Sequence, residues 1–285
     1  MKLTGNRTIV TGGTKGLGHA IVKVFLQNGA TVVFCGRSSD EVSVVETELR
    51  QEFEGTAWGI MCDIASEKSV ERFVSEARER LGGIDTLVNN AGVIGPIGAT
   101  EQVCWTEWEE TITINLLGTV RMCRAVVPGM VKAGYGKIIN LSGGGATAPL
   151  PRFSAYGASK AAVVRFSETL ALELLGTGVD VNAVAPGMLH TRMLNQVLEA
   201  GAEAAGENYF QTVKNGIENG TAPLTMGAEL CVYLASKQSN GITGKLISAQ
   251  WDPWRTLHEH LDELAKSDIY CLRRIIPEDR DQTWT

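Results

Sequence analysis

Long hydrophobic runs are absent from this chain of 285 residues. No segment approaches the ~20 consecutive apolar residues that a membrane-spanning helix requires. The N-terminal segment MKLTGNRTIVTGG reaches its glycines before any long apolar stretch forms, unlike a secretory signal peptide. We therefore expect a cytoplasmic protein without a membrane partner.

Paired cysteines and clustered basic residues are also absent. The six cysteines lie far apart and form no C-x-x-C pair, so we expect free thiols, no zinc site and no other bound metal. The 26 lysines and arginines are scattered and outnumbered by 32 acidic residues, which does not suit nucleic acid as a partner. With 44% apolar residues the chain can bury one large core, and we expect one globular domain.

Short apolar segments alternate along the chain with segments of helical periodicity. This alternation is typical of an α/β fold, in which helices cover both faces of a parallel sheet. The glycine-containing segment 195–221 lacks this regular alternation, and we interpret it as a mobile excursion from the domain. The predicted strands are residues 8–11, 31–35, 58–62, 86–89, 137–141, 179–185 and 245–248.

The motif TGGTKGLGHA follows the first predicted strand and opens the first helix. Glycines let the backbone turn sharply and approach a phosphate, while the free N–H groups of the helix start supply positive potential. His19 and Ala20 stand where a P-loop would carry a lysine and a hydroxyl residue. The motif therefore predicts a dinucleotide-binding turn formed by Gly12, Thr14, Lys15, Gly16, Leu17 and Gly18.

The second predicted strand, residues 31–35, bears on the choice of nucleotide. An acidic side chain at the end of this strand commonly binds the ribose of NAD, whereas here Gly36 and Arg37 follow the strand. Lys15 adds a second cation from within the glycine-rich turn. Two cations without a carboxylate favour the extra phosphate of NADP(H), with NAD(H) as the alternative. Both cations also suit ordinary solvent-exposed positions.

Further motifs follow in a fixed order: Asp63 after a strand, NNAG at 89–92, Asn115 within TITINLLGTV, YGASK at 156–160 and PGMLHT at 186–191. Together with TGGTKGLG, they resemble the single-domain branch of the short-chain dehydrogenase/reductase family. The resemblance covers about residues 2–252. It implies a Rossmann-type doubly wound parallel sheet of about seven strands, with helices on both faces. It also implies a nicotinamide cofactor and a homodimer or homotetramer.

The resemblance divides the chain into a nucleotide-binding domain at 1–252, with a substrate lid at about 188–222, and a C-terminal extension at 253–285. Asp63 is expected to accept a hydrogen bond from the adenine amino group, but it equally suits the acidic start of the next helix. Thr191 is expected to reach the nicotinamide carboxamide. The cofactor-binding residues expected on this basis are Asp63, Ile64, Asn89, Asn90, Gly92, Tyr156, Lys160, Pro186, Gly187 and Thr191.

Tyr156 and Lys160 are expected to be catalytic. Hydride transfer to a carbonyl creates an alkoxide that must receive a proton, so the site needs an acid. Residues four apart share one face of a helix, so we expect the Lys160 ammonium to lower the pKa of the Tyr156 phenol from about 10. In the resembling family this lysine also holds the nicotinamide ribose. The residue matching Asn115 helps to position a water that relays the proton.

The serine of the expected catalytic set is displaced in this sequence. The resembling family carries a serine thirteen residues before the tyrosine, where it donates a hydrogen bond to the substrate oxygen, but this position is Gly143. Ser142 lies one residue earlier, and one step along a strand reverses the direction of the side chain. Either the glycines of GGGATAPLP let Ser142 turn inward, or a backbone N–H replaces the hydroxyl. Without any donor, the rate would fall by about 10²- to 10³-fold.

We therefore expect an NADP(H)-dependent oxidoreductase that interconverts a carbonyl compound and a secondary alcohol, with a small molecule as substrate. Two alternatives remain open. The first is an epimerase or dehydratase that passes through a transient ketone. The second is a cofactor-binding sensor or assembly protein without catalysis, which Gly143 favours and the presence of Asn115, Tyr156 and Lys160 opposes.

The C-terminal extension carries an apolar stripe at helical spacing, formed by Trp254, Leu257, Leu261 and Leu264. We expect this stripe to cover the core of its own or a neighbouring subunit. The alternative is that the extension brings its arginines to the mouth of the active site, which would suit an anionic substrate. These arginines are Arg273, Arg274 and Arg280.

Overall fold

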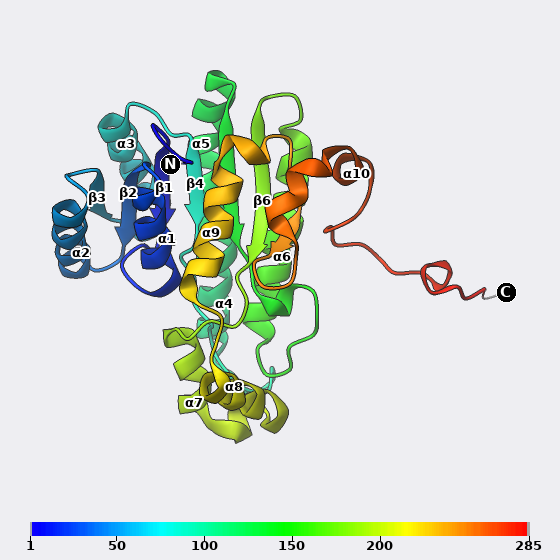
Figure 1. Cartoon of the computed structure of the whole chain (residues 1–285). Coiled ribbons are helices and arrows are strands. Elements are labelled where there is room, and N and C mark those ends of the chain that lie inside the picture. The colour runs from blue at the N-terminus through cyan, green and yellow to red at the C-terminus, as the bar shows by residue number, and fades with distance from the viewer. Residues whose placement is uncertain (1, 284–285) are drawn as a thin grey trace.

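A computed structural model describes residues 2–283 of the chain. Its centre is a parallel sheet of seven strands in the order β3-β2-β1-β4-β5-β6-β7, which confirms the doubly wound fold (Figure 1). The strands are β1 (Arg7–Thr11), β2 (Thr31–Gly36), β3 (Ala57–Met61), β4 (Thr86–Asn89), β5 (Gly136–Leu141), β6 (Val179–Ala185) and β7 (Leu246–Ser248). All seven were predicted to within one residue at each end.

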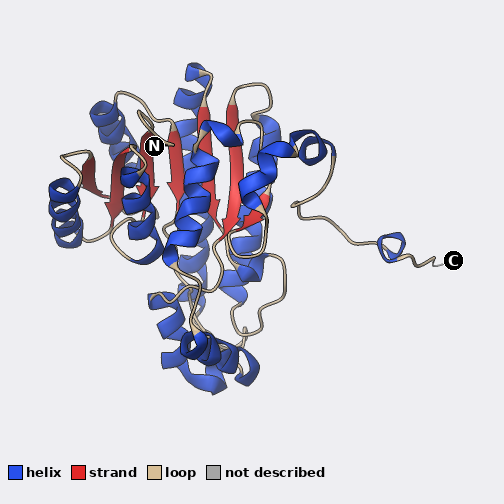
Figure 2. Ribbon diagram, in the orientation of Figure 1, coloured by secondary structure: helices blue, strands red, loops and turns tan. Residues whose placement is uncertain are grey.

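Helices cover both faces of this sheet (Figure 2). Consecutive strand residues point to opposite faces, and neighbours such as Ile9 and Val10 accordingly belong to two separate buried clusters. One face packs against α1 and α9, and the other packs against α3 and α5. The helices are α1 (Gly16–Gln27), α2 (Ser39–Glu52), α3 (Glu67–Leu81), α4 (Trp105–Ile112), α5 (Thr119–Ala133), α6 (Ser154–Glu173), α7 (Arg192–Ala205), α8 (Glu207–Asn219), α9 (Leu224–Ala235) and α10 (Leu261–Lys266).

The segment that we interpreted as an irregular excursion is helical. Helices α7 and α8 form a small lobe beyond the carboxyl ends of the strands (Figure 1). The two helices pack around an apolar cluster that includes Leu194, Val197 and Val213 and that they share with Ile94 and Phe153. A backbone bridge between Leu189 and Ala222 closes the base of the lobe. The glycines in this segment led us to expect irregular structure. Gly201 interrupts α7 and Gly206 separates α7 from α8, but the residues on either side of each glycine are helical.

The first part of the C-terminal extension covers the core of its own chain. Trp254, Leu257 and Leu264 are each at most 4% exposed and belong to the same buried cluster as α1 and α9. Leu261 lies outside this contact, with 36% of its surface exposed. A 3₁₀ helix at Trp254–Glu259 precedes α10, so the apolar stripe is divided between two short elements.

Within residues 2–283, no helix is both long and apolar enough to cross a bilayer. The same part of the chain holds no group of three or more side chains suited to a metal ion. All six cysteines are free thiols, and four of them are buried.

Candidate active site

A cleft of about 1460 Å³ opens at the carboxyl ends of the parallel strands. This is where doubly wound sheets bind ligands. At least one residue that directly follows each strand lines the cleft, from Gly12 after β1 to Gln250 near the end of β7. Of the expected site residues, the cleft brings together Gly12, Thr14, Lys15, Gly16, Leu17, Gly18, Arg37, Asp63, Ile64, Asn90, Gly92, Ser142, Tyr156, Lys160, Pro186, Gly187 and Thr191.

The glycine-rich turn between β1 and α1 is too tightly packed for side chains at two of its positions. A Cβ atom on Gly18 would lie 2.0 Å from the Gly12 carbonyl oxygen and 2.4 Å from Asn90 Nδ2. Gly12 itself has a φ of +65°, which favours glycine. Asn90 holds the turn, because its Nδ2 donates to the carbonyl oxygens of Thr11 and Gly12 at 3.0 and 3.1 Å. The bare backbone at the start of α1 fits a dinucleotide phosphate.

The corner beside this turn holds the two cations expected to contact the ribose phosphate. Lys15 is exposed and its Nζ donates to Glu41 Oε1 at 2.6 Å. Arg37 forms no ion pair within residues 2–283. Glu41 also lines the cleft, so a carboxylate from the first turn of α2 reaches this corner. Sequence analysis missed it, because only the end of the preceding strand was searched for an acidic residue.

Asp63 and Ile64 lie in the turn after β3 and line the cleft. Asp63 Oδ1 accepts a hydrogen bond from the backbone N–H of Ala65 at 3.0 Å. Helix α3 begins at Glu67 with Ser66 as its cap, so Asp63 is not the acidic residue of the first helical turn. The structure therefore does not support the alternative role of Asp63 as a helix-start residue.

Asn89 and Asn115 do not line the cleft. Asn89 is buried below it, where its Nδ2 donates to Asn140 Oδ1 at 2.9 Å and Asn140 in turn donates to Ser167 Oγ. The expectation that Asn89 lines the cofactor groove is corrected accordingly, since the side chain of a strand residue can point into the core. Asn89 instead links β4 and β5 below the cleft.

Asn115 joins three segments around the candidate active site. It lies in a π-helical turn at Thr113–Gly118, a distortion that often occurs at functional sites. Its side chain exchanges two hydrogen bonds with the backbone of Val93, at 2.8 and 2.9 Å, and donates to Ser159 Oγ on α6 at 3.0 Å. A Cβ atom on Gly92 would lie 3.1 Å from Asn115 Oδ1 and 3.5 Å from Lys160 Nζ. Gly92 thus leaves room for both side chains.

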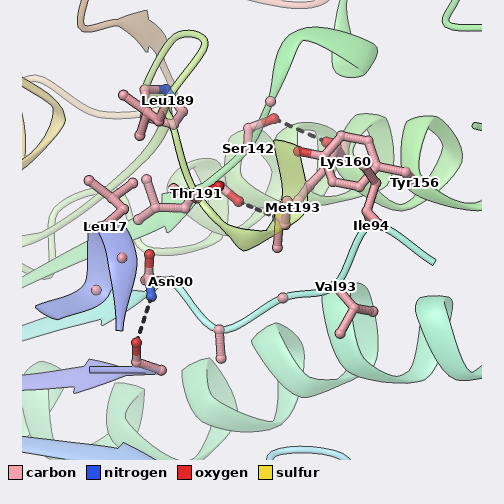
Figure 3. A pocket seen from close by; sticks show the side chains of 18 of the residues that line it. Leu17, Asn90, Val93, Ile94, Ser142, Tyr156, Lys160, Leu189, Thr191 and Met193 are labelled. Carbon is pink, nitrogen blue, oxygen red and sulfur yellow. Dashed lines mark hydrogen bonds between the residues drawn. The ribbon is translucent and has the colours of Figure 1, made fainter. Parts of the chain in front are cut away.

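Tyr156 and Lys160 lie one turn apart on α6 (Figure 3). Lys160 is 5% exposed, and its Nζ donates to the Leu141 carbonyl oxygen at 2.9 Å. Its Nζ is 5.8 Å from the centre of the Tyr156 ring. Burial lowers the pKa of Lys160 to about 8. Burial, with a smaller contribution from Tyr209, raises the pKa of Tyr156 to about 12.

This result corrects the expected direction of the Tyr156 pKa shift. A cation near a phenol lowers its pKa, whereas removal of water raises it. In the structure, Lys160 is turned towards Leu141 and makes no hydrogen bond to the phenol, so the loss of water dominates. The phenol therefore keeps its proton at neutral pH.

Gly143 provides the space that the Tyr156 hydroxyl occupies. A Cβ atom on Gly143 would lie 2.4 Å from Tyr156 Oη, closer than any non-bonded contact allows. Ser142 is buried, and its Oγ donates to the Lys160 carbonyl oxygen at 3.4 Å (Figure 3). The Ser142 hydroxyl makes no hydrogen bond to Tyr156. A serine at position 143 and the observed position of Tyr156 are thus incompatible.

Sequence analysis missed the apolar walls next to Tyr156. The lobe of α7 and α8 and the loops after β4 and β5 supply them, and Tyr209 of α8 adds a second phenol to the cleft. No motif marks these residues, because any apolar side chain of suitable size fills a wall. The residues are Ile94, Leu150, Met193, Leu194, Val197 and Tyr209.

Comparisons with known proteins agree with this geometry. The family described as short chain dehydrogenase matches residues 6–201. The chain is 32% identical to the 3-oxoacyl-(acyl-carrier-protein) reductase FabG of Aquifex aeolicus, over 87% of this chain and 96% of that protein. It is 38% identical to a chlorophyll(ide) b reductase, NOL, of Oryza sativa subsp. japonica, over 65% of this chain and 56% of that protein.

A solved structure is similar as well. A single-substitution variant of the actinorhodin polyketide ketoreductase, solved with NADPH, superposes with a TM-score of 0.78 at 31% identity, over 85% of this chain and 95% of that chain. The match to the family and these relatives lead to one conclusion. The chain belongs to the short-chain dehydrogenase/reductase family of NAD(P)-dependent oxidoreductases, which interconvert alcohols and carbonyl compounds.

Proposed function

We propose that the protein is an NADP(H)-dependent reductase of a carbonyl compound, in which Tyr156 donates the proton. The observation that carries this proposal is a pair of ionisable groups with shifted pKa values, the partly buried Tyr156 and the buried Lys160, side by side at the cleft. Buried ionisable groups with strongly shifted pKa values are concentrated at functional sites. The bound nicotinamide would supply the hydride.

The protein residues supply the proton and its control. Because burial raises the pKa of Tyr156 to about 12, the phenol is protonated and ready to donate when an alkoxide develops on the substrate. The pKa of Lys160 is about 8, so this side chain is largely an ammonium at neutral pH. One of its three N–H groups donates to Leu141, and two remain for the cofactor ribose and for a water that Asn115 helps to position.

The glycine-rich turn, Asp63, Ile64, Asn90, Gly92, Pro186, Gly187 and Thr191 would hold the cofactor. NADP(H) is favoured over NAD(H) by Arg37, which lies free at the corner of the cleft, and by Lys15 once it leaves Glu41. The solved ketoreductase similar to this chain contains NADPH. Glu41 is the feature that favours NAD(H), because a carboxylate suits a free ribose hydroxyl.

The substrate would be apolar at the end that lies near Tyr156. The walls there come from Ile94, Leu150 and the lobe of α7 and α8, which we propose as the substrate lid at 188–222. Arg273, Arg274 and Arg280 do not line the cleft, so the structure gives no support to an anionic substrate held by the extension. Ser142 or a backbone N–H of Gly143 to Gly145 would donate to the substrate oxygen.

We also propose a homodimer or homotetramer. Apolar side chains are exposed on α5, on the π-helical turn before it, on α6 and directly after α6. Leu172 and Leu175 are 69% and 63% exposed, and Leu117 and Val131 are about two-fifths exposed. Exposed apolar side chains that gather into a patch mark subunit contacts, and we propose that these four do so.

The proposed proton donor predicts the behaviour of Tyr156→Phe. We expect this variant to lose about 10²- to 10⁴-fold in kcat for carbonyl reduction, because only the hydroxyl is removed. NADPH binding should stay within about twofold, since the ring remains in its apolar surroundings. Absorbance at the nicotinamide band, with fluorescence titration of NADPH, measures both. Undiminished turnover in this variant would refute the proposal.

The contact between Gly143 and Tyr156 predicts that Gly143→Ser impairs the enzyme, although it restores the family's residue. The new Cβ would displace the hydroxyl by about 1 Å, and a shift of this size costs about 10²-fold in rate. Gly144→Ser is the matched control, because it keeps the backbone N–H and nothing lies within 4 Å of a Cβ at that position. Steady-state kcat values compare the two. A faster Gly143→Ser enzyme would show that the missing hydroxyl limits the rate.

The cofactor preference predicts opposite effects of two substitutions at the same corner. Arg37→Ala should weaken NADPH binding by about tenfold or more through the loss of a charge-assisted hydrogen bond, and leave NADH binding unchanged. Glu41→Gln should strengthen NADPH binding, because it frees Lys15 from its 2.6 Å ion pair. Fluorescence titrations give the four dissociation constants. Equal losses for NADH and NADPH in Arg37→Ala would contradict the assignment.

A further inference from the structure

The second part of the C-terminal extension runs beside the outer edge of the sheet. The backbone N–H of Leu246 on β7 donates to the Tyr270 carbonyl oxygen at 2.8 Å. This contact ties the extension to a strand whose residues Leu246 and Ser248 line the cleft. Residues 267–272, which we call the tail strap, are thereby fixed beside the cleft.

A buried lysine anchors the tail strap. Lys245 is 5% exposed, and its Nζ donates to the carbonyl oxygens of Ser267 and Ile269 at 3.1 and 3.0 Å. A third contact, at 3.4 Å, joins it to Cys271 Sγ. All these partners belong to the tail strap, and within residues 2–283 Lys245 forms no ion pair. A buried ammonium is costly without hydrogen bonds, so Lys245 and the strap depend on each other.

Helix α6 supplies a second anchor. Glu168 is 7% exposed, and its Oε1 accepts a hydrogen bond from the backbone N–H of Leu272 at 2.6 Å. Arg165 donates to the carbonyl oxygen of Leu272 and pairs with Glu168 at 2.7 Å. Both side chains belong to the helix that carries Tyr156 and Lys160. Leu272 is therefore held at both backbone groups by the catalytic helix.

The tail strap reaches the active-site cleft. Tyr270, Cys271 and Leu272 are among the residues that line it. Leu272 also packs against the cluster of Ala146, Val164 and Ala183. Ala146 ends the turn that begins after Gly143, so the strap lies on the Tyr156 side of the cleft.

Two buried charged side chains hold a segment that only packs on the outside of the core, through Tyr270 and Leu272. Trp254, Leu257 and Leu264 already seal the core before the strap begins. Beyond Leu272 the chain turns away, and Arg273 pairs with Asp268 and Asp279 of the extension itself. The hydrogen bonds with the Leu246 N–H, Glu168 and Arg165 hold Tyr270 and Leu272, which line the cleft, and this indicates a role at the cleft.

We propose that Tyr270 and Leu272 form the outer wall of the substrate site, and that Lys245 and Glu168 are positioning residues for this wall. The wall is apolar and aromatic, so the site would take a carbonyl compound with an extended apolar substituent that reaches past Tyr156 to the tail strap. This inference rests on the proposed function for the location of the substrate. Contact with the strap would then set which substituent lengths bind.

Binding of 2-alkanones of increasing length to the full chain, saturated with NADP⁺, tests the wall without any need for turnover. Titration calorimetry should show that Leu272→Ala weakens binding of long alkanones by about tenfold and leaves butanone unchanged, because only a long substituent reaches the strap. Leu272→Met should restore the binding of long alkanones. Arg255→Gln is the matched control, because Arg255 belongs to the extension but lies outside the tail strap. It breaks only an exposed ion pair with Glu229 of α9, so this variant should bind the alkanones as the wild type does.

The positioning role has its own measurement. Lys245→Met should increase hydrogen exchange in residues 267–272. It should also weaken the binding of long alkanones as Leu272→Ala does, and leave the affinity for NADP⁺ unchanged. If Lys245→Met increases exchange but leaves the alkanone affinities unaltered, the proposed wall is overturned. It is also overturned if Leu272→Ala weakens the binding of alkanones of every length equally, or if the wild type binds no alkanone. Wild-type binding without NADPH oxidation would instead contradict the proposed function and leave the wall supported.

Discussion

The site depends on one burial: Lys160 is withdrawn from water beside the partly buried Tyr156. A buried ammonium must be hydrogen-bonded, and the Leu141 carbonyl at the end of β5 provides this bond. The same loss of water brings the pKa of Lys160 to about 8 and that of Tyr156 to about 12. The site therefore holds a cation near its titration point next to a phenol that keeps its proton.

Close packing around this pair explains the surrounding glycines. Gly143 leaves room for the Tyr156 hydroxyl, and Gly92 leaves room for Asn115 and Lys160. Gly18 does the same for the backbone of the nucleotide-binding turn. At Gly143 and Gly18 the structure requires the absence of a side chain rather than a positive φ, whereas a Cβ on Gly92 would be a tight contact with Asn115. Because position 143 is glycine rather than serine, the Tyr156 hydroxyl occupies the space that a side chain at this position would fill.

Much of this arrangement was accessible from the sequence, and the limits are physical. Alternating strands and helices predicted the sheet, since buried parallel strands must be short and apolar. The motifs predicted which segments meet, because loops at the carboxyl ends of the strands converge. Asn89 was misplaced because a strand reverses its side-chain direction at each residue. The direction of the Tyr156 pKa shift could not be predicted from the sequence either, since it depends on how much water reaches the phenol. Glu41 and the tail strap come from segments without a motif.

The central claim is that burial outweighs Lys160 in setting the protonation state of Tyr156. An ultraviolet difference titration of the cofactor-free protein, with Tyr156→Phe subtracted, measures the phenolate directly. The account predicts no Tyr156 phenolate up to about pH 10.5, beyond the ordinary phenol midpoint near 10, in keeping with a pKa of about 12. A phenolate that appears between about pH 8 and 9 would show that the ammonium dominates, and would contradict the account.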